Sequence, residues 1–270
     1  MEYERILRTL TDALDDYTTD QRGDVGSWVR VASAKSIAQV LAGAASQPNA
    51  LQLVPQELFT PAIAGIAKQA FEKLDVVREA ATEAWSVLLA ADADKVWDWP
   101  GAEAMATTES GERRVRPSAE WFSAGLALLQ TSIHASVAAG IVQSAGAVVH
   151  STSERCLRPL IPWLQKHDES QFVIDIVDVL AANLASNRIA VPALTTLSRL
   201  MDAGIEPSEE EAGRMLGLAA RGLTTLKSIE RLQAAMRVIV GVFVLHYPDT
   251  QRRAAGFIGS LLSHRFPRVS

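Results

Sequence analysis

The fold is indicated most clearly by residues 62–90, AIAGIAKQAFEKLDVVREAATEAWSVLLA. Apolar side chains recur there every three or four residues, first in a stripe from Ile63 to Leu74 and then in a second stripe from Val77 to Leu88. This spacing is that of an α-helix with one buried face. The segment therefore predicts two antiparallel helices that pack against each other.

The same helical period recurs along almost the whole chain, whereas alternating strand patterns are scarce. Three positions, Ser151, Asp168 and Ser208, each precede a Glu or Gln by three residues, which is the pattern of a capping box at a helix start. Helices are predicted at roughly 2–14, 25–43, 55–73, 75–91, 118–131, 133–145, 151–166, 169–186, 190–203, 208–222, 227–246 and 249–264.

Helices of this length, joined by short polar connections, predict an all-α fold: an α-solenoid of stacked antiparallel helix pairs of the HEAT/armadillo kind. An array of four-helix bundles is the alternative. We expect residues 1–270 to form a single helical-repeat domain, with an irregular insertion at about 92–117. Trp97 and Trp99 in this insertion either plug the end of a helix pair, which we favour, or anchor an interface.

The composition excludes several classes of function. The chain has 26 Lys and Arg against 31 Asp and Glu, so no broad positive field is available to hold nucleic acid. Its most apolar long window, residues 124–149, is interrupted by polar side chains too often for a membrane span. Because Cys156 is the single cysteine, the chain can form no internal disulfide, and a reducing cytoplasmic location is expected.

The motifs of catalysis and of cofactor binding are also missing from the sequence. It contains no Gly-Lys-Ser/Thr phosphate loop, and its five histidines do not have the spacing of metal ligands. We therefore expect no catalytic residues, no bound cofactor and no metal site.

The most distinctive stretch is residues 15–30, DDYTTDQRGDVGSWVR, which we call the signature segment. A helix is predicted to end near Asp15, and Gly23 and Gly26 would allow a positive φ or a close backbone approach. Asp24 is expected as the N-cap of the next helix. Tyr17 and Trp28 are expected to be packed, so that with the two glycines they form the structural part of the segment.

The charged residues of this segment are candidates for contact with a partner protein. Arg22 and Arg30 either pair with the neighbouring aspartates or meet a partner carboxylate, and both interpretations stay open. The candidate partner-binding residues are Asp20, Arg22, Asp24 and Arg30.

The signature segment resembles the stretch that opens the C-terminal domain of the tubulin-folding cofactor D family, Tyr-Thr-x-Asp-x-Arg-Gly-Asp-Val-Gly-x-Trp-Val-Arg. The resemblance implies a C-terminal part of a longer chain that acts as a binding protein or chaperone rather than as an enzyme. It implies β-tubulin, the tubulin-folding cofactors C and E, and an Arl-type small GTPase as partners. It also implies a role in assembly of the tubulin heterodimer and in microtubule organisation, with GTPase activation by the cofactor complex as a whole.

A second hypothesis from another class remains. The chain could be a generic HEAT-repeat interaction scaffold or adaptor, with the likeness in residues 15–30 arising by accident. Binding of β-tubulin by the purified chain discriminates between the two.

Overall fold

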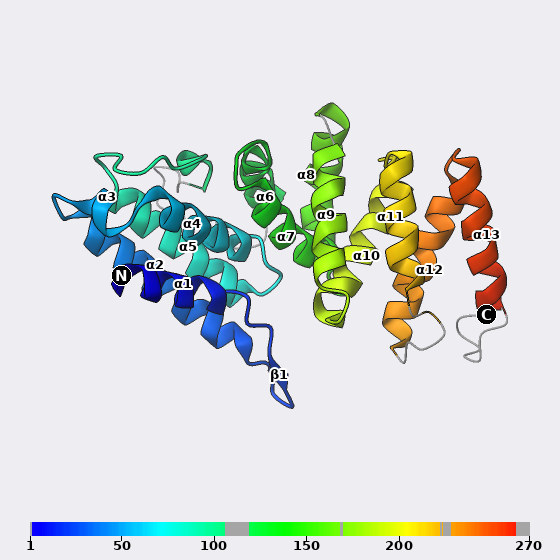
Figure 1. Cartoon of the computed structure of the whole chain (residues 1–270), viewed down its shortest axis with the longest axis horizontal. Coiled ribbons are helices and arrows are strands. Elements are labelled where there is room, and N and C mark those ends of the chain that lie inside the picture. Colours follow the sequence, from blue (N-terminus) through cyan, green and yellow to red (C-terminus); the bar gives the residue numbers. More distant parts are fainter. Residues whose placement is uncertain (1, 106–118, 168–169, 222, 224–227, 263–270) are drawn as a thin grey trace. The chain divides into compact units, whose positions relative to one another are not determined.

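The computed structural model describes residues 2–105, 119–167, 170–221, 223 and 228–262. These residues divide into two compact units, 1–144 and 145–270. Each unit is built from helices, and the described residues contain no strands beyond one short hairpin. Figure 1 shows the helices of each unit lying side by side.

The first unit begins with α1 (Glu2–Ala13), followed by a hairpin of β1 (Thr19–Asp20) and β2 (Gly23–Asp24). The remaining elements of this unit are α2 (Gly26–Ala45), α3 (Ala50–Leu53), α4 (Gln56–Ala70), α5 (Asp75–Ala91), the 3-10 turn η1 (Ala102–Met105), α6 (Ala119–Gly125), the 3-10 turn η2 (Leu126–Gln130) and α7 (His134–Ala145), which ends at the boundary. Helix α2 packs on α5 and α1 packs on α4, so these four helices form two layers.

The second unit contains α8 (His150–Lys166), α9 (Ser170–Ala182), α10 (Asn187–Asp202), α11 (Glu209–Ala220), α12 (Ile229–Val244) and α13 (Pro248–Leu262). Helix α10 packs on α9 and α12, and α12 packs on α11 and α13. Helix α11 also packs on α9 and α13. Helices α9, α11 and α13 therefore form one layer, and α10 and α12 form the other. This two-layer stacking of helix pairs within the unit is the arrangement that the apolar stripes predicted.

The predicted all-α fold of stacked helix pairs is confirmed within each unit, and most helix bounds agree with the prediction to within a few residues. The stripes of residues 62–90 form α4 and α5, with Ile63, Ile66 and Trp85 fully buried. The expectation of one repeat domain spanning both units stays a prediction.

Three local predictions about helix starts have different outcomes. Ser208 forms the predicted capping box with Glu211 at the start of α11. The prediction at Ser151 is wrong, because α8 begins one residue earlier, with Val149 as its N-cap. The signal at Asp168 lies outside the described residues.

The part of the predicted insertion that the structure describes, residues 92–105, packs back on the helices. Trp97 is buried, stacks on Phe59 with ring centroids 4.7 Å apart, and donates its indole N–H to the Val54 carbonyl at 2.8 Å. Trp99 contacts both Phe59 and Trp85. The favoured interpretation of these tryptophans as a plug is confirmed, and residues 106–117 of the insertion lie outside the described part.

Among the helices that the structure describes, none is both long and apolar enough to cross a membrane.

Candidate partner-binding site

The signature segment forms a short hairpin after α1 and continues into the first turns of α2, and the hairpin projects from the helices of the first unit (Figure 1). Asp16 starts the turn out of α1 by accepting the Thr18 amide at 2.8 Å. At the tip, Asp20 accepts the Arg22 amide at 2.7 Å, and Gly23 has a φ of 110°. A positive φ is strained for side chains with a Cβ, so a glycine is favoured at this position, as the sequence predicted.

Gly26 is required for a different reason than a positive φ. Its amide donates to the Thr18 carbonyl at 2.9 Å, which draws the start of α2 against the chain that leaves α1. A Cβ at this position would lie 2.3 Å from the Asp16 carbonyl oxygen. The close backbone approach, one of the two roles expected for this glycine, is therefore the one observed.

Arg30 lies at the centre of a largely buried group of polar side chains, which we call the Arg30 cluster: Tyr17, Asp24, Arg30, Lys68, Gln69 and Glu72. The guanidinium is fully buried and makes two hydrogen bonds of 3.2 Å to the Asp24 carboxylate. It also donates to the Asp16 carbonyl at 2.5 Å. Arg30 thereby joins both ends of the hairpin, at Asp16 and Asp24, to α2.

The cluster also joins the hairpin to α4. The Arg30 guanidinium lies over the Tyr17 ring, 4.4 Å from its centroid, and Lys68 approaches the same ring at 5.4 Å. Lys68 pairs with Asp15, and Gln69 donates to the Leu14 carbonyl at 2.7 Å. Because these contacts come from helices on both sides, the base of the hairpin has little freedom to move.

Glu72, just beyond the end of α4, is only partly compensated within the cluster. Its Oε2 accepts the Leu74 amide at 2.6 Å, whereas its Oε1 has no hydrogen-bond partner and lies 3.7 Å from the Arg30 guanidinium. Burial raises the pKa of this carboxyl, and the Leu74 amide and Arg30 only partly oppose the rise. Burial likewise raises the pKa of the Tyr17 hydroxyl. For both Glu72 and Tyr17, burial therefore shifts the pKa more than the nearby hydrogen bonds and charges do.

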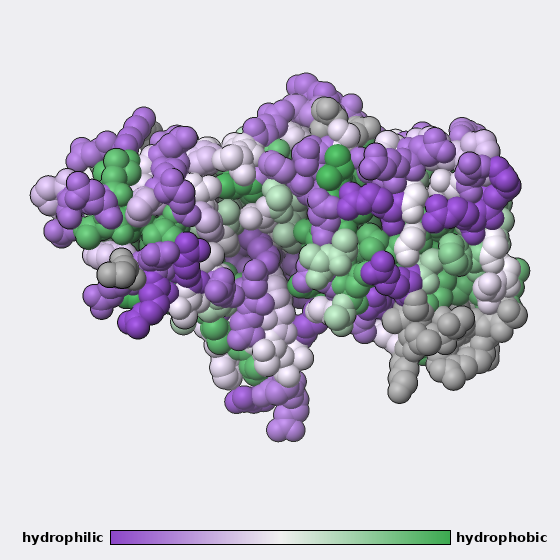
Figure 2. Space-filling model, in the orientation of Figure 1, coloured by the Kyte–Doolittle hydropathy of each residue, from purple (hydrophilic) through white to green (hydrophobic). Residues whose placement is uncertain are grey.

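The outer side of the hairpin has the opposite character. Arg22, with its side chain 63% exposed, donates to Asp20 at 2.6 Å, and its guanidinium lies 5.2 Å from the ring centroid of Trp28. Trp28 is 62% exposed, and Val29 beside it is also exposed. We call Asp20, Arg22, Trp28 and Val29 the Arg22 face. Figure 2 shows hydrophilic side chains gathered at the projecting end of the hairpin.

The charges of the Arg22 face are held in place before any partner arrives. Hydrogen bonds from the Arg22 guanidinium and amide lower the pKa of Asp20, so this carboxylate stays ionised at neutral pH. The cation over the Trp28 ring restrains the indole as well. The face thus offers an aromatic ring, a cation and an anion on a hairpin whose base is locked.

Three expectations from the sequence need correction. Trp28 is exposed rather than packed, because the first turn of α2 presents it to the outside of the hairpin. Asp24 is not the N-cap: that position is Val25, although Asp24 does accept the Ser27 amide at 3.1 Å. Arg30 is fully buried on Asp24, so neither residue offers its charge to a partner in this structure.

Sequence reasoning offered a pairing of Arg30 with aspartates such as Asp24 as one of two alternatives, but it missed the companions Lys68 and Gln69 from α4 and Glu72 just beyond it. These residues lie some forty or more positions away in the chain, and polar residues near a helix end usually face water. No local pattern marks them as buried. Among the described residues, no group of three or more His, Cys, Asp or Glu side chains could hold a metal ion.

Comparison with known proteins gives similarities of three kinds. Residues 60–231 match the family described as "Tubulin folding cofactor D C terminal". Tubulin-folding cofactor D of Schizosaccharomyces pombe is 32% identical over 81 residues, which are 30% of this chain and 7% of the yeast protein. A designed armadillo repeat protein is similar over 97% of this chain and 94% of its own, with 12% identity and a TM-score of 0.37, a likeness too weak to carry an argument.

The family match and the signature segment are independent observations. The matched residues, 60–231, include Lys68 and Gln69 of α4 but not the hairpin. The chain also spans only a small fraction of the yeast relative's length.

Proposed function

Because this chain belongs to the tubulin folding cofactor D C-terminal family, we propose that it is a chaperone-type binding protein, rather than an enzyme, that binds β-tubulin during assembly of the α/β-tubulin heterodimer. The match covers well over half of the chain, from residue 60 to residue 231. The curated relative from yeast carries the same family name.

The observation that carries the binding proposal is the preorganised Arg22 face. Tryptophan and arginine are the side chains most often found among the residues that dominate protein interfaces. Ordering a flexible side chain on binding costs roughly 0.5–1.5 kcal/mol, and the contacts of Arg22 with Asp20 and Trp28 reduce that cost in advance. We propose Asp20, Arg22 and Trp28 as the residues that meet β-tubulin.

Asp24 and Arg30 have an indirect role in this proposal. They hold the base of the hairpin, and the hydrogen bonds of 3.2 Å between them fix where the Arg22 face stands. Both are therefore positioning residues, whereas the sequence alone had left a partner contact open for them.

The remaining partners follow from the family and are proposed on that ground. They are the tubulin-folding cofactors C and E and an Arl-type small GTPase, with activation of GTP hydrolysis as a property of the cofactor complex. A cytoplasmic site of action, in organisation of the microtubule cytoskeleton, is part of the same proposal. The net charge of −5 gives no support to a nucleic-acid partner.

The test is capture of β-tubulin by the purified chain and by two variants. Trp28→Ala removes the exposed ring and is expected to weaken binding by at least about thirtyfold, the effect of a residue contributing about 2 kcal/mol. Leu51→Ala is the matched control, because Leu51 is also exposed on the first unit, at 54%, but lies outside the Arg22 face.

Two results would count against the proposal. If the wild-type chain, folded by circular dichroism, captures no β-tubulin, the generic scaffold is the better account. If Trp28→Ala and Leu51→Ala bind as the wild type does, the chain binds tubulin through another surface.

A further inference from the structure

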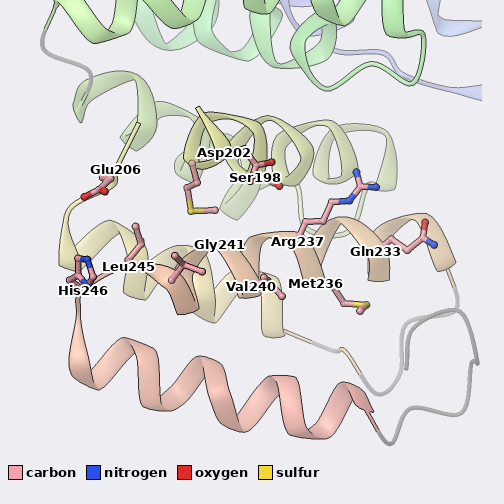
Figure 3. A pocket seen from close by; sticks show the side chains of 12 residues that line it. Ser198, Asp202, Glu206, Gln233, Met236, Arg237, Val240, Gly241, Leu245 and His246 are labelled. Atoms are coloured by element: carbon pink, nitrogen blue, oxygen red, sulfur yellow. The ribbon is translucent and has the colours of Figure 1, made fainter. Parts of the chain in front are cut away.

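A second surface, in the other unit, has the features of a docking groove. It is an open groove of about 750 Å³ between α10 and α12, the two helices that form one layer of this unit. Met201 from α10 and Met236, Val240, Gly241 and Val244 from α12 line it with apolar surface. Figure 3 labels Met236, Val240 and Gly241 on α12, and Ser198 and Asp202 on the neighbouring α10.

The apolar surface of the groove is unusually exposed for a packed helix. Val240 is 48% exposed and Val244 is 67% exposed. Together with Met236 they follow a four-residue spacing, so they form a straight stripe along α12. Eight residues of helix correspond to roughly 12 Å, about the length of two turns of a second helix laid beside them.

The depth of the groove depends on Gly241. A Cβ at this position would lie 2.6 Å from the terminal methyl of Met201, so the thioether occupies the space that any larger residue would need. Met201 and Met236 are both adaptable side chains, which suits a surface that must fit another molecule. A side chain at position 241 would therefore push the flexible end of Met201 aside and change the lining of the groove.

The chemistry of the groove selects one mode of peptide recognition. An extended peptide needs the free edge of a sheet, and both walls here are helices whose backbone groups are paired internally. A polyproline segment needs a groove lined by Trp, Tyr or Phe, and none of these is among the lining residues of this one. A phosphopeptide needs a cluster of arginines, whereas Arg237 is the one arginine in the lining. An amphipathic helix satisfies its own backbone and requires only the apolar stripe.

The two ends of the groove carry opposite charge. Asp202 and Glu206 lie toward one end and Arg237 lies toward the other (Figure 3). Helices α10 and α12 both finish at the acidic end, at Asp202 and Val244, so the negative ends of their dipoles add to that potential. An incoming helix would thus place its own positive N-terminus at Glu206 and its C-terminus at Arg237.

We propose that the groove between α10 and α12 binds an amphipathic helix of a partner protein, with basic residues in its first turn and an acidic residue in its last. The helix lies antiparallel to α10 and α12, with an apolar face of i, i+3/i+4 and i+7 side chains on Met236, Val240 and Val244. This site is separate from the Arg22 face and does not depend on the tubulin proposal.

The probe is a synthetic fifteen-residue peptide with leucines on one face, lysine and arginine in its first turn and glutamate in its last. A hydrocarbon staple on the polar face keeps it helical. Fluorescence anisotropy should show saturable binding to the wild-type chain. A stapled peptide with the same leucines but glutamates at both ends should bind at least about fivefold more weakly, because like charges then meet at Asp202 and Glu206.

Two glycine variants locate the binding. Gly241→Leu displaces the Met201 thioether and narrows the groove, so it should weaken binding at least about tenfold. Gly256→Leu is its matched control, since Gly256 lies within α13 with open space around it, and this variant should bind within about twofold of the wild type. Thermal melting checks that each variant is folded. Because both variants replace a glycine by leucine within a helix, the gain in helix propensity is the same in the two.

The orientation gives a further test. A nitroxide on the N-terminus of the peptide should broaden the methyl resonances of Val244 more than those of Met236. Failure of the peptide to bind, or equal binding to Gly241→Leu and the wild type, would overturn the proposal. Dimerisation of the free chain that Gly241→Leu abolishes would overturn it too, because the occupant would then be a second copy.

Discussion

Two arginines eight positions apart in the signature segment have opposite environments. Arg30 is fully buried between the Asp24 carboxylate, the Asp16 carbonyl and the Tyr17 ring. Arg22 is mostly exposed and pairs with Asp20 on the surface. A buried pair is costly to break, whereas an exposed pair contributes little to stability. The comparison shows that one hairpin can separate a structural base from a face left free for recognition.

The comparison predicts its largest effect at Arg30. Arg30→Ala should lower the free energy of unfolding by about 3–5 kcal/mol, because it leaves the carboxylates of Asp24 and Glu72 without their shared cation in a buried site. Urea denaturation measures the loss. Arg8→Ala, at an exposed i,i+4 pair with Glu4, serves as the control and should change it by less than about 1 kcal/mol. A similar small loss in both variants would mean that the cluster does not hold the hairpin.

A smaller effect is expected at Gly26. Gly26→Ala should destabilise the chain by about 1–3 kcal/mol, because the new methyl group meets the backbone of Asp16, which cannot move as a side chain can. Gly43→Ala, in the same helix with open space around it, should instead stabilise the chain by up to about 1 kcal/mol. Equal effects in the two variants, compared by thermal melting, would contradict the close approach.

Glu72 offers a test that depends on pH. Since the folded state raises the pKa of this carboxyl above its usual value, the folded chain holds the proton more tightly than the unfolded chain. The contribution of Glu72 to stability must then fall as the pH rises from about 4.5 toward the raised pKa. Lys73 and Arg30 reduce this fall, and Asp24 increases it.

The variant Glu72→Gln removes the titration. Measured by urea denaturation across this pH range, its stability relative to the wild type should rise with increasing pH. A relative stability that stays constant or falls would show that the ionised Glu72 is well compensated by Arg30.

The difference between the two arginines also shows where sequence reasoning reached its limit. The apolar period of residues 62–90 identified α4 and α5, because a helix with one buried face has apolar residues at a regular spacing of three or four. The pattern of Ser208 and Glu211 identified the start of α11 for a similarly local reason.

The role of each arginine could not be decided in the same way. Both sit among aspartates in residues 15–30, and only the packing of Lys68, Gln69 and Glu72 against the hairpin base determines which one is buried. Trp28 was expected to be packed because tryptophan usually is. Trp28 is exposed because of the direction in which α2 leaves the hairpin. No local sequence pattern indicates that direction.

The smallest effect on stability is expected at Arg22, and this variant tests the central claim most directly. For Arg22→Ala, the free energy of unfolding and the affinity for β-tubulin should be measured on the same preparation, with Arg8→Ala as the matched exposed arginine. The account predicts a stability within about 1 kcal/mol of the wild type and an affinity at least about tenfold weaker. An unchanged affinity in a stable Arg22→Ala chain, or a loss that Arg8→Ala reproduces, would contradict it.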